Sequence, residues 1–138
     1  MFLQPKKSKH KKIQKGNIKQ YKRQKYRTCL GNYYLKAAQS GLLSSKQLES
    51  TRQALTRKIK KKGKVWLKVF PQLPITKKPN ETRMGKGKGV VQYWVARVRG
   101  GSILFELIGI PYKLAKSAFK TGSSKLPITT RLITVIKR

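Results

Sequence analysis

The sequence predicts an α+β fold: a single compact domain with a mixed or antiparallel sheet, two packed helices, a basic N-terminal extension and a long loop rich in glycine and lysine. The expected order of elements is strand, helix, strand, strand pair, helix and strand, which is typical of helices packed on one sheet. The 138 residues suffice for one core. Residues 1–27 are lysine-rich and contain no acid, so we assign them to the extension and residues 28–138 to the domain.

The first expected strand covers residues 28–38, where apolar residues alternate, and Gly41 ends it. A helix should follow from about Ser45 to Lys62. Ser44 begins a capping box in front of it, and apolar residues then recur on one helical stripe. The opposite face of this helix is rich in lysine and arginine.

A second strand is expected over Lys64–Phe70, because both of its faces are largely apolar. Irregular structure should follow at Pro71, Pro74 and Pro79. A long loop then runs through Arg83–Gly89. Strands resume at Val91–Val98 and Ile103–Ile108, and a glycine-rich turn should join these two strands as a hairpin.

The end of the chain predicts a second helix and a last strand. Pro111 suits the first turn of a helix with an apolar face, and Gly122 should stop that helix. Residues 128–136 are rich in β-branched side chains, which favour a strand.

The net charge restricts the function more than any motif does. The chain carries 35 Lys and Arg against 3 Asp and Glu, a formal net charge of +32. Such a chain needs a polyanion, and nucleic acid fits best because neutralised phosphates release counterions. A membrane surface fits less well, because the lysines are spread along the chain instead of gathered on one amphipathic helix.

The cations expected to contact RNA lie in the extension and on the outer face of the first helix. They are Lys6, Lys7, Lys9, Lys11, Lys12, Lys15, Arg52, Arg57 and Lys61. For the helix face, a solvated charged surface is the alternative, and the sequence leaves it open.

Glycine alternates with cations in one segment of the long loop, composed of Arg83, Met84, Gly85, Lys86, Gly87, Lys88 and Gly89. Glycines let backbone amides approach an anion closely, and the lysines add charge beside it. A nucleotide-hydrolysing loop is the alternative, but such a loop leads into a helix with Lys-Ser or Lys-Thr, whereas a strand follows here. Phosphate contact in a polynucleotide is the better interpretation.

An enzyme is not expected, because the supply of acids and bases is limited to Glu49, Glu81, Glu106 and His10. No catalytic residue, metal site or cofactor follows from this set, and a nucleic-acid enzyme would need an acid cluster. The lone Cys29 provides neither a disulfide nor a zinc site. A DNA-packaging protein would explain the charge, but not the strand-rich core with its glycine-lysine loop.

Several segments resemble the large-subunit ribosomal protein sixteen family, in family order and at family spacing. They are Leu3–Lys7, Lys64–Pro71, Pro74–Thr76, Arg83–Gly89, Tyr93–Ala96, Ile103–Glu106, Gly109–Pro111, Ala118–Lys120 and Lys125–Ile128. The resemblance spans nearly the whole chain but is poor between Asn17 and Asn32. Gln72, Lys77 and Lys113 stand where bacterial relatives often carry acids.

The resemblance implies a structural constituent of the large ribosomal subunit. Such a protein binds large-subunit ribosomal RNA near the peptidyl-transferase centre, contacts tRNA, and supports translation and late subunit assembly. Arg83–Gly89 would then reach toward the tRNA end, and the extension would thread between RNA helices. We expect neighbouring ribosomal proteins as further partners, with no membrane and no homo-oligomer.

The family pattern begins at Leu3, almost at Met1, so we expect the protein to be made in the compartment where it works. Lysine outnumbers arginine, and isoleucine and tyrosine are plentiful, a bias typical of AT-rich coding sequences. We therefore expect an organelle-encoded protein of the mitochondrial ribosome, with a plastid or the bacterial cytoplasm as the alternative.

Overall fold

A computed structural model describes residues 3–18, 31–60 and 62–134 of the chain. Its helices and strands are β1 (Tyr33–Ala37), β2 (Gly41–Ser44), α1 (Ser45–Ile59), β3 (Lys64–Leu67), β4 (Leu73–Lys77), β5 (Val90–Val98), β6 (Ile103–Ile108), α2 (Tyr112–Ser123) and β7 (Thr130–Thr134). The α+β prediction is confirmed. The expected boundary between residues 27 and 28 lies outside the described residues.

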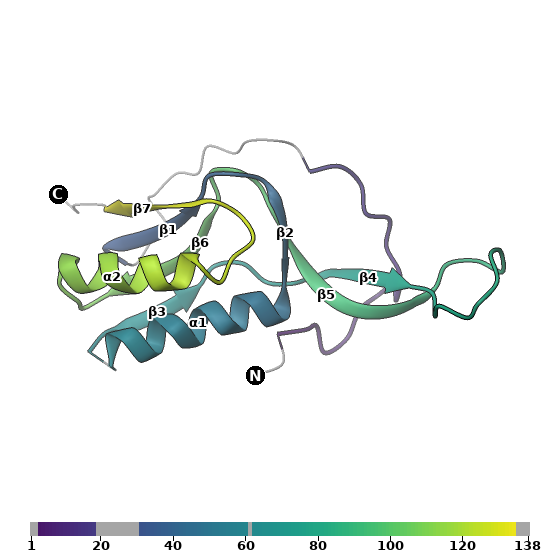
Figure 1. The fold of residues 1–138 in the computed structure, drawn as a ribbon, viewed down its shortest axis with the longest axis horizontal. Coiled ribbons are helices and arrows are strands. Elements are labelled where there is room, and N and C mark those ends of the chain that lie inside the picture. Colours follow the sequence, from purple (N-terminus) through teal and green to yellow (C-terminus); the bar gives the residue numbers. More distant parts are fainter. Residues whose placement is uncertain (1–2, 19–30, 61, 135–138) are drawn as a thin grey trace.

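The strands form two antiparallel sheets where one was expected. One sheet has the order β3-β6-β1-β7 and the other has the order β2-β5-β4. Both helices pack against each other and lie along the four-stranded sheet, as Figure 1 shows. Their buried residues, including Leu48, Leu55 and Phe119, share one core with Leu35 and Phe105 of that sheet.

The prediction that β5 and β6 form a hairpin is wrong, because the two strands belong to different sheets. Gly41 lies opposite Val98 and Lys36 lies opposite Ile103, so β1 and β2 together run antiparallel to β6 and β5. Backbone hydrogen bonds, such as Ala37 N to Ser102 O at 2.9 Å, continue this pairing through the bend. The glycine-rich turn carries the chain from one sheet into the other.

Two strands were missed by sequence reasoning. Pro74 lies inside β4, which is an edge strand of the three-stranded sheet and can therefore accommodate a residue without an N–H. Gly41 was expected to end the first strand, but it is the first residue of β2. A Cβ on Gly41 would lie 2.6 Å from Cγ2 of Ile128, so close packing explains the glycine.

The first helix begins as predicted and ends early. The Ser44 side chain accepts a hydrogen bond from the Gln47 backbone, and the Gln47 side chain accepts one from the Ser44 backbone, so the capping box is confirmed. Lys60 adopts a left-handed conformation with φ 51°, which ends the helix before Lys62.

The second helix differs from the prediction at both ends. Pro111 is the N-cap and does not lie in the first turn. Gly122 does not stop the helix, which runs to Ser123. A Cβ on Gly122 would lie 3.0 Å from Cδ2 of Leu55, so this glycine allows the two helices to approach closely. The last strand, β7, lies within the predicted range.

Candidate nucleic-acid interface

The glycine-lysine loop is the tip of a hairpin formed by β4 and β5. These strands pair along their length, and residues 78–89 connect them at the far end. Figure 1 shows the loop projecting well away from the helices and the four-stranded sheet. Residues 81–88 are exposed, and Met84 reaches 92% exposure. The expected position of the loop between two strands is confirmed, although the strand before it was not expected.

The backbone of the loop depends on its glycines. Gly85 and Gly87 have φ angles of +94° and +80°, and Lys86 between them has φ 52°. Glycine adopts such angles without steric cost. Lys78, at the base of the loop, donates a hydrogen bond to the Gly85 carbonyl. The loop therefore has a defined backbone conformation that depends on its glycines, and Lys86 is exposed on it.

The N-terminal extension lies against the same hairpin. The Lys12 ammonium donates to the Lys88 carbonyl at 2.6 Å, and the Lys88 ammonium donates to the Ile13 carbonyl at 2.8 Å. Arg97 of β5 donates to the Gln14 carbonyl at 3.0 Å. The hairpin thus holds the extension by its backbone, and the lysines of its described part, residues 3–18, are exposed.

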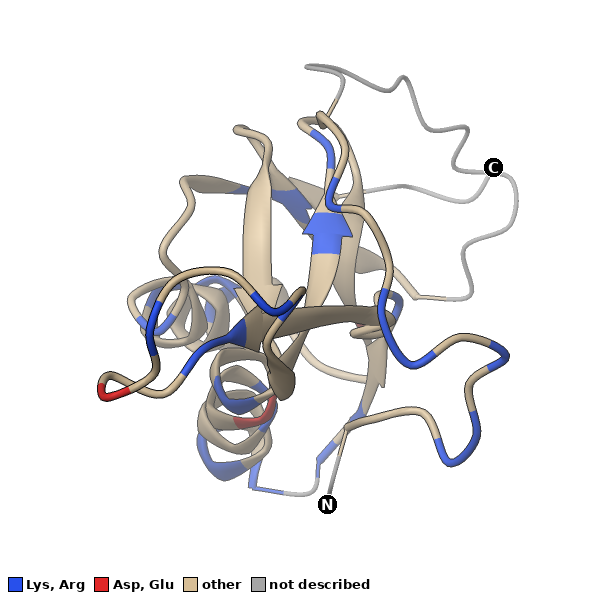
Figure 2. Cartoon of the chain, turned by 90° about the vertical axis from the view of Figure 1, so that its right-hand side faces the viewer, with Lys and Arg blue, Asp and Glu red and all other residues tan. Residues whose placement is uncertain are grey.

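The far end of the extension is anchored differently. Leu3 is 8% exposed and belongs to the core cluster that contains both helices. The six expected RNA-binding lysines of the extension are all exposed: Lys6, Lys7, Lys9, Lys11, Lys12 and Lys15. Figure 2 looks onto the end of the molecule where the hairpin loop projects, and Lys and Arg recur there along the extension and the loop. The structure therefore brings these two expected sites together.

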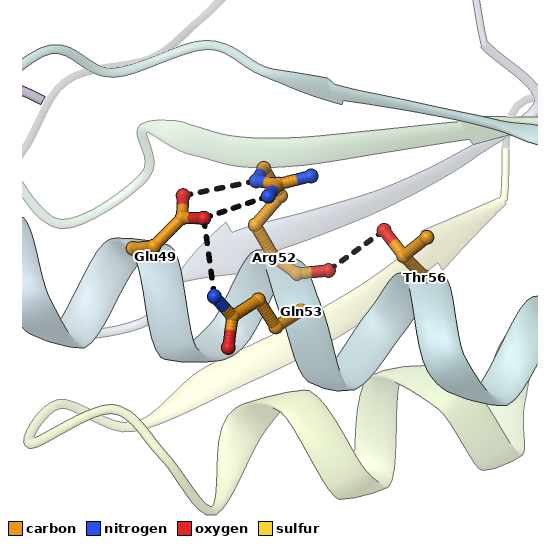
Figure 3. A network of polar contacts seen from close by, with 4 residues as sticks. All are labelled: Glu49, Arg52, Gln53 and Thr56. Carbon is orange, nitrogen blue, oxygen red and sulfur yellow. Dashed lines mark hydrogen bonds and ion pairs between the residues drawn. The ribbon is translucent and has the colours of Figure 1, made fainter. Parts of the chain in front are cut away.

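The expected cations of α1 lie elsewhere and are not equivalent. Arg57 is exposed on the helix surface, and Lys61 lies outside the described residues. Arg52 binds the carboxylate of Glu49 through two hydrogen bonds, Nε to Oε2 at 2.9 Å and Nη2 to Oε1 at 2.6 Å (Figure 3). Gln53 donates to the same Oε1 at 3.3 Å.

This network changes the protonation properties of both partners. The hydrogen bond from Arg52 lowers the pKa of Glu49 most, although burial opposes it, and the bond to Glu49 raises the pKa of Arg52. Both groups therefore stay ionised, and part of the Arg52 charge is neutralised within the protein. A bidentate pair uses two of the five N–H donors of a guanidinium, so Arg52 retains donors for a phosphate.

Sequence reasoning missed Lys78 and Arg97, which hold the loop and the extension. Their contacts are to backbone carbonyls, and no residue spacing reveals such contacts. Among the described residues no group of three or more His, Cys, Asp or Glu side chains could hold a metal ion. In the same residues, no helix is long and apolar enough to cross a membrane.

Comparison with known proteins identifies the family. A profile described as ribosomal protein L16p/L10e matches residues 5–133. Proteins named large ribosomal subunit protein uL16 are similar to this chain over 96% of its length. The one from Blochmanniella pennsylvanica is 51% identical over 133 residues, which are 98% of that protein. Those from Erythrobacter litoralis and Maricaulis maris are 48% and 43% identical over 132 residues, covering 92% and 96% of each. This chain therefore belongs to the ribosomal protein L16p/L10e family.

Proposed function

We propose that the chain binds large-subunit ribosomal RNA near the peptidyl-transferase centre and contacts tRNA, and that it thereby supports translation and late subunit assembly. Membership in the family makes it a structural constituent of the large ribosomal subunit and not an enzyme. The observation that supports the proposed RNA and tRNA contacts is the projecting β4–β5 hairpin. Its tip is exposed and basic, its backbone depends on glycines, and the lysine-rich extension is bound at its base.

A projecting tip suits contact with RNA that lies beyond the protein's own surface. Residues 83–88 are exposed, and their cations can flank a phosphate backbone while backbone amides at the glycines approach it. In our proposal, the loop Arg83–Gly89 reaches toward the tRNA end. The lysines of the extension, with Arg52, Arg57 and Lys61, contact ribosomal RNA. We keep residues 1–27 as the RNA-binding extension and residues 28–138 as the domain.

We also propose that the chain contacts neighbouring ribosomal proteins. We do not expect it to bind a second copy of itself. We propose the mitochondrial ribosome as the location. Lysine outnumbers arginine, and both isoleucine and tyrosine are plentiful, which is the bias expected of an AT-rich organellar coding sequence. The relatives described above come from bacteria, so the cytoplasm of a bacterium is the alternative, together with a plastid. Imaging of a tagged chain beside a mitochondrial marker distinguishes these locations.

Sedimentation tests the proposed function directly. Native lysate is run through a gradient with and without ribonuclease, and the chain is followed beside large-subunit RNA. We expect co-sedimentation that survives moderate salt and is lost after digestion. Migration with DNA would instead favour a DNA-packaging protein, and migration at the top of the gradient would contradict assembly into a subunit.

A further inference from the structure

A groove of about 620 Å³ opens between the first half of α1, the start of β5 and the Leu3–Gln4 segment. Its volume lies within the range of roughly 300–1,000 Å³ that is typical of small-ligand sites. The loop and the extension lysines discussed above do not line it. Its chemistry also differs from the rest of this basic surface, because the groove contains a carboxylate, aromatic rings and several neutral polar side chains.

We propose that this groove binds a single unstacked nucleobase of RNA, with Tyr93 as the stacking surface and the Glu49 carboxylate as the acceptor for an N–H on the edge of the base. The inference rests on the proposed RNA-binding function and adds a base-recognition site to it. Sequence-specific recognition of RNA commonly uses such splayed bases, stacked on aromatic side chains and hydrogen-bonded at their edges.

Tyr93 supplies the flat surface that a base requires. The residue is 44% exposed although it lies in a paired strand, opposite Ile75 of β4. Trp94, the next residue, is partly exposed and lines the same groove. Exposed aromatic rings beside a polyanion-binding surface are the usual platforms for unpaired bases.

Glu49 is held in place before any ligand arrives. Within the part of the chain that the structure describes, its Oε1 accepts from Arg52 and Gln53, whereas its Oε2 accepts from the Nε of Arg52 alone. A carboxylate oxygen offers about two acceptor positions, so Oε2 can accept a further donor. The bidentate bond fixes the orientation of the carboxylate (Figure 3).

An ionised carboxylate selects the ligand by its charge. It accepts hydrogen bonds and donates none, so it repels a phosphate or a carbonyl oxygen and favours an amino group. Cytosine presents an amino group at the position where uracil presents a carbonyl oxygen, and acidic side chains are known acceptors for that amino group. Lys46, which also lines the groove, can hold the phosphate that flanks the bound base. The groove therefore prefers cytosine to uracil.

The preference is measurable with the full chain and two oligoribonucleotides of equal length, oligo(C) and oligo(U). Fluorescence anisotropy at neutral pH, at a salt concentration that suppresses purely ionic binding, gives the ratio of their dissociation constants. We expect oligo(C) to bind about tenfold more tightly, as one hydrogen bond to a charged group allows. Charge effects cancel in the ratio.

Two variants locate the preference in the groove. Glu49→Gln raises the net charge and should tighten both oligonucleotides, yet it should bring the ratio close to one, because an amide also donates to uracil. Tyr93→Leu should weaken both oligonucleotides several-fold. As controls, Glu81→Gln adds the same charge on the hairpin loop and should keep the ratio, and Tyr112→Leu, at a tyrosine that is 48% exposed on α2, should keep both affinities.

The outcomes separate this proposal from the one on which it rests. Equal binding of the two oligonucleotides would overturn the base site and leave RNA binding intact. A preference that survives Glu49→Gln would place recognition elsewhere and would also overturn it. Failure to bind either RNA even at low salt, where ionic contacts are strong, would remove the proposed function itself. A groove that instead takes a cationic segment of a protein would show the first of these results.

Discussion

Lys12 and Lys88 hold the extension against the hairpin through two reciprocal hydrogen bonds, each from the side chain of one segment to the backbone of the other. The Lys12 ammonium reaches the Lys88 carbonyl at 2.6 Å, and the Lys88 ammonium reaches the carbonyl of Ile13, the next residue after Lys12, at 2.8 Å. Lys88 is therefore committed to a contact within the protein, whereas Lys86 is exposed at the tip. The two lysines of the loop should differ in function.

Replacing Lys88 by Met should release the extension from the hairpin. We expect faster hydrogen exchange and faster proteolysis at residues 11–15, with little change in Tm because the contact is exposed. Lys86→Met removes the same charge without removing a contact to the extension, so it serves as the control. Equal protection of the extension in both variants would show that the hydrogen bonds between Lys12 and Lys88 do not hold the extension in place.

Charge reversal at the tip should affect tRNA more than assembly. In ribosomes carrying Lys86→Glu, we expect near-normal incorporation of the protein but slower tRNA accommodation, because a phosphate backbone would meet a carboxylate in place of a cation. Incorporation is measured from purified subunits and accommodation by rapid kinetics. The matched control reverses one exposed lysine of α2, Lys113. Normal peptide synthesis by the loop variant would rule out this function of the tip.

Local patterns predicted the elements whose determinants are local. The capping box at Ser44 and the apolar stripe predicted the start and the buried face of α1 correctly, since both depend on neighbours within one or two turns. The choice of strand partners is not local. The glycines near residue 100 predicted a change of direction, but nothing in the segment specifies whether β5 then pairs with β6 or, as observed, with β2 and β4.

The candidate site was predictable to a similar extent. Alternation of glycine and lysine identified the loop, and the charge identified the extension, but their contact through Lys12 and Lys88 joins residues 76 positions apart. Such a contact requires the tertiary fold. The Glu49–Arg52 pair, by contrast, has the i, i+3 spacing at which helical side chains meet, and that spacing could have revealed it.

A buried carboxylate links β3 and β6 and should contribute to stability. Glu106 is fully buried, and its Oε1 lies 3.2 Å from the ammonium of Lys68, just after the end of β3. Lys68→Met removes the cation and leaves the carboxylate inside, so we expect the free energy of unfolding to fall by about 1–3 kcal/mol. Chemical denaturation measures it. Lys64→Met, at an exposed lysine of β3, is the control, and an equal effect of both would contradict the ion pair.

The Glu49–Arg52 pair should make stability depend on pH in the acidic range. Because the hydrogen bond from Arg52 lowers the pKa of Glu49 below its ordinary value of 4.5, the pair stabilises the fold above that value and loses its contribution as the pH falls through the lower, folded-state pKa. The side chains of Arg52 and Glu49 are 37% and 15% exposed, so the contribution should stay below about 1 kcal/mol.

Denaturation of the wild type and of Glu49→Gln should therefore show a difference in unfolding free energy at neutral pH that shrinks below pH 4.5. In an Arg52→Met background, the same substitution should show much less of this pH dependence, because the hydrogen bond that lowers the pKa of Glu49 is absent. High salt should weaken the difference at neutral pH, since both partners contact solvent. A difference that stays constant from neutral to acidic pH would show that Arg52 does not control the ionisation of Glu49.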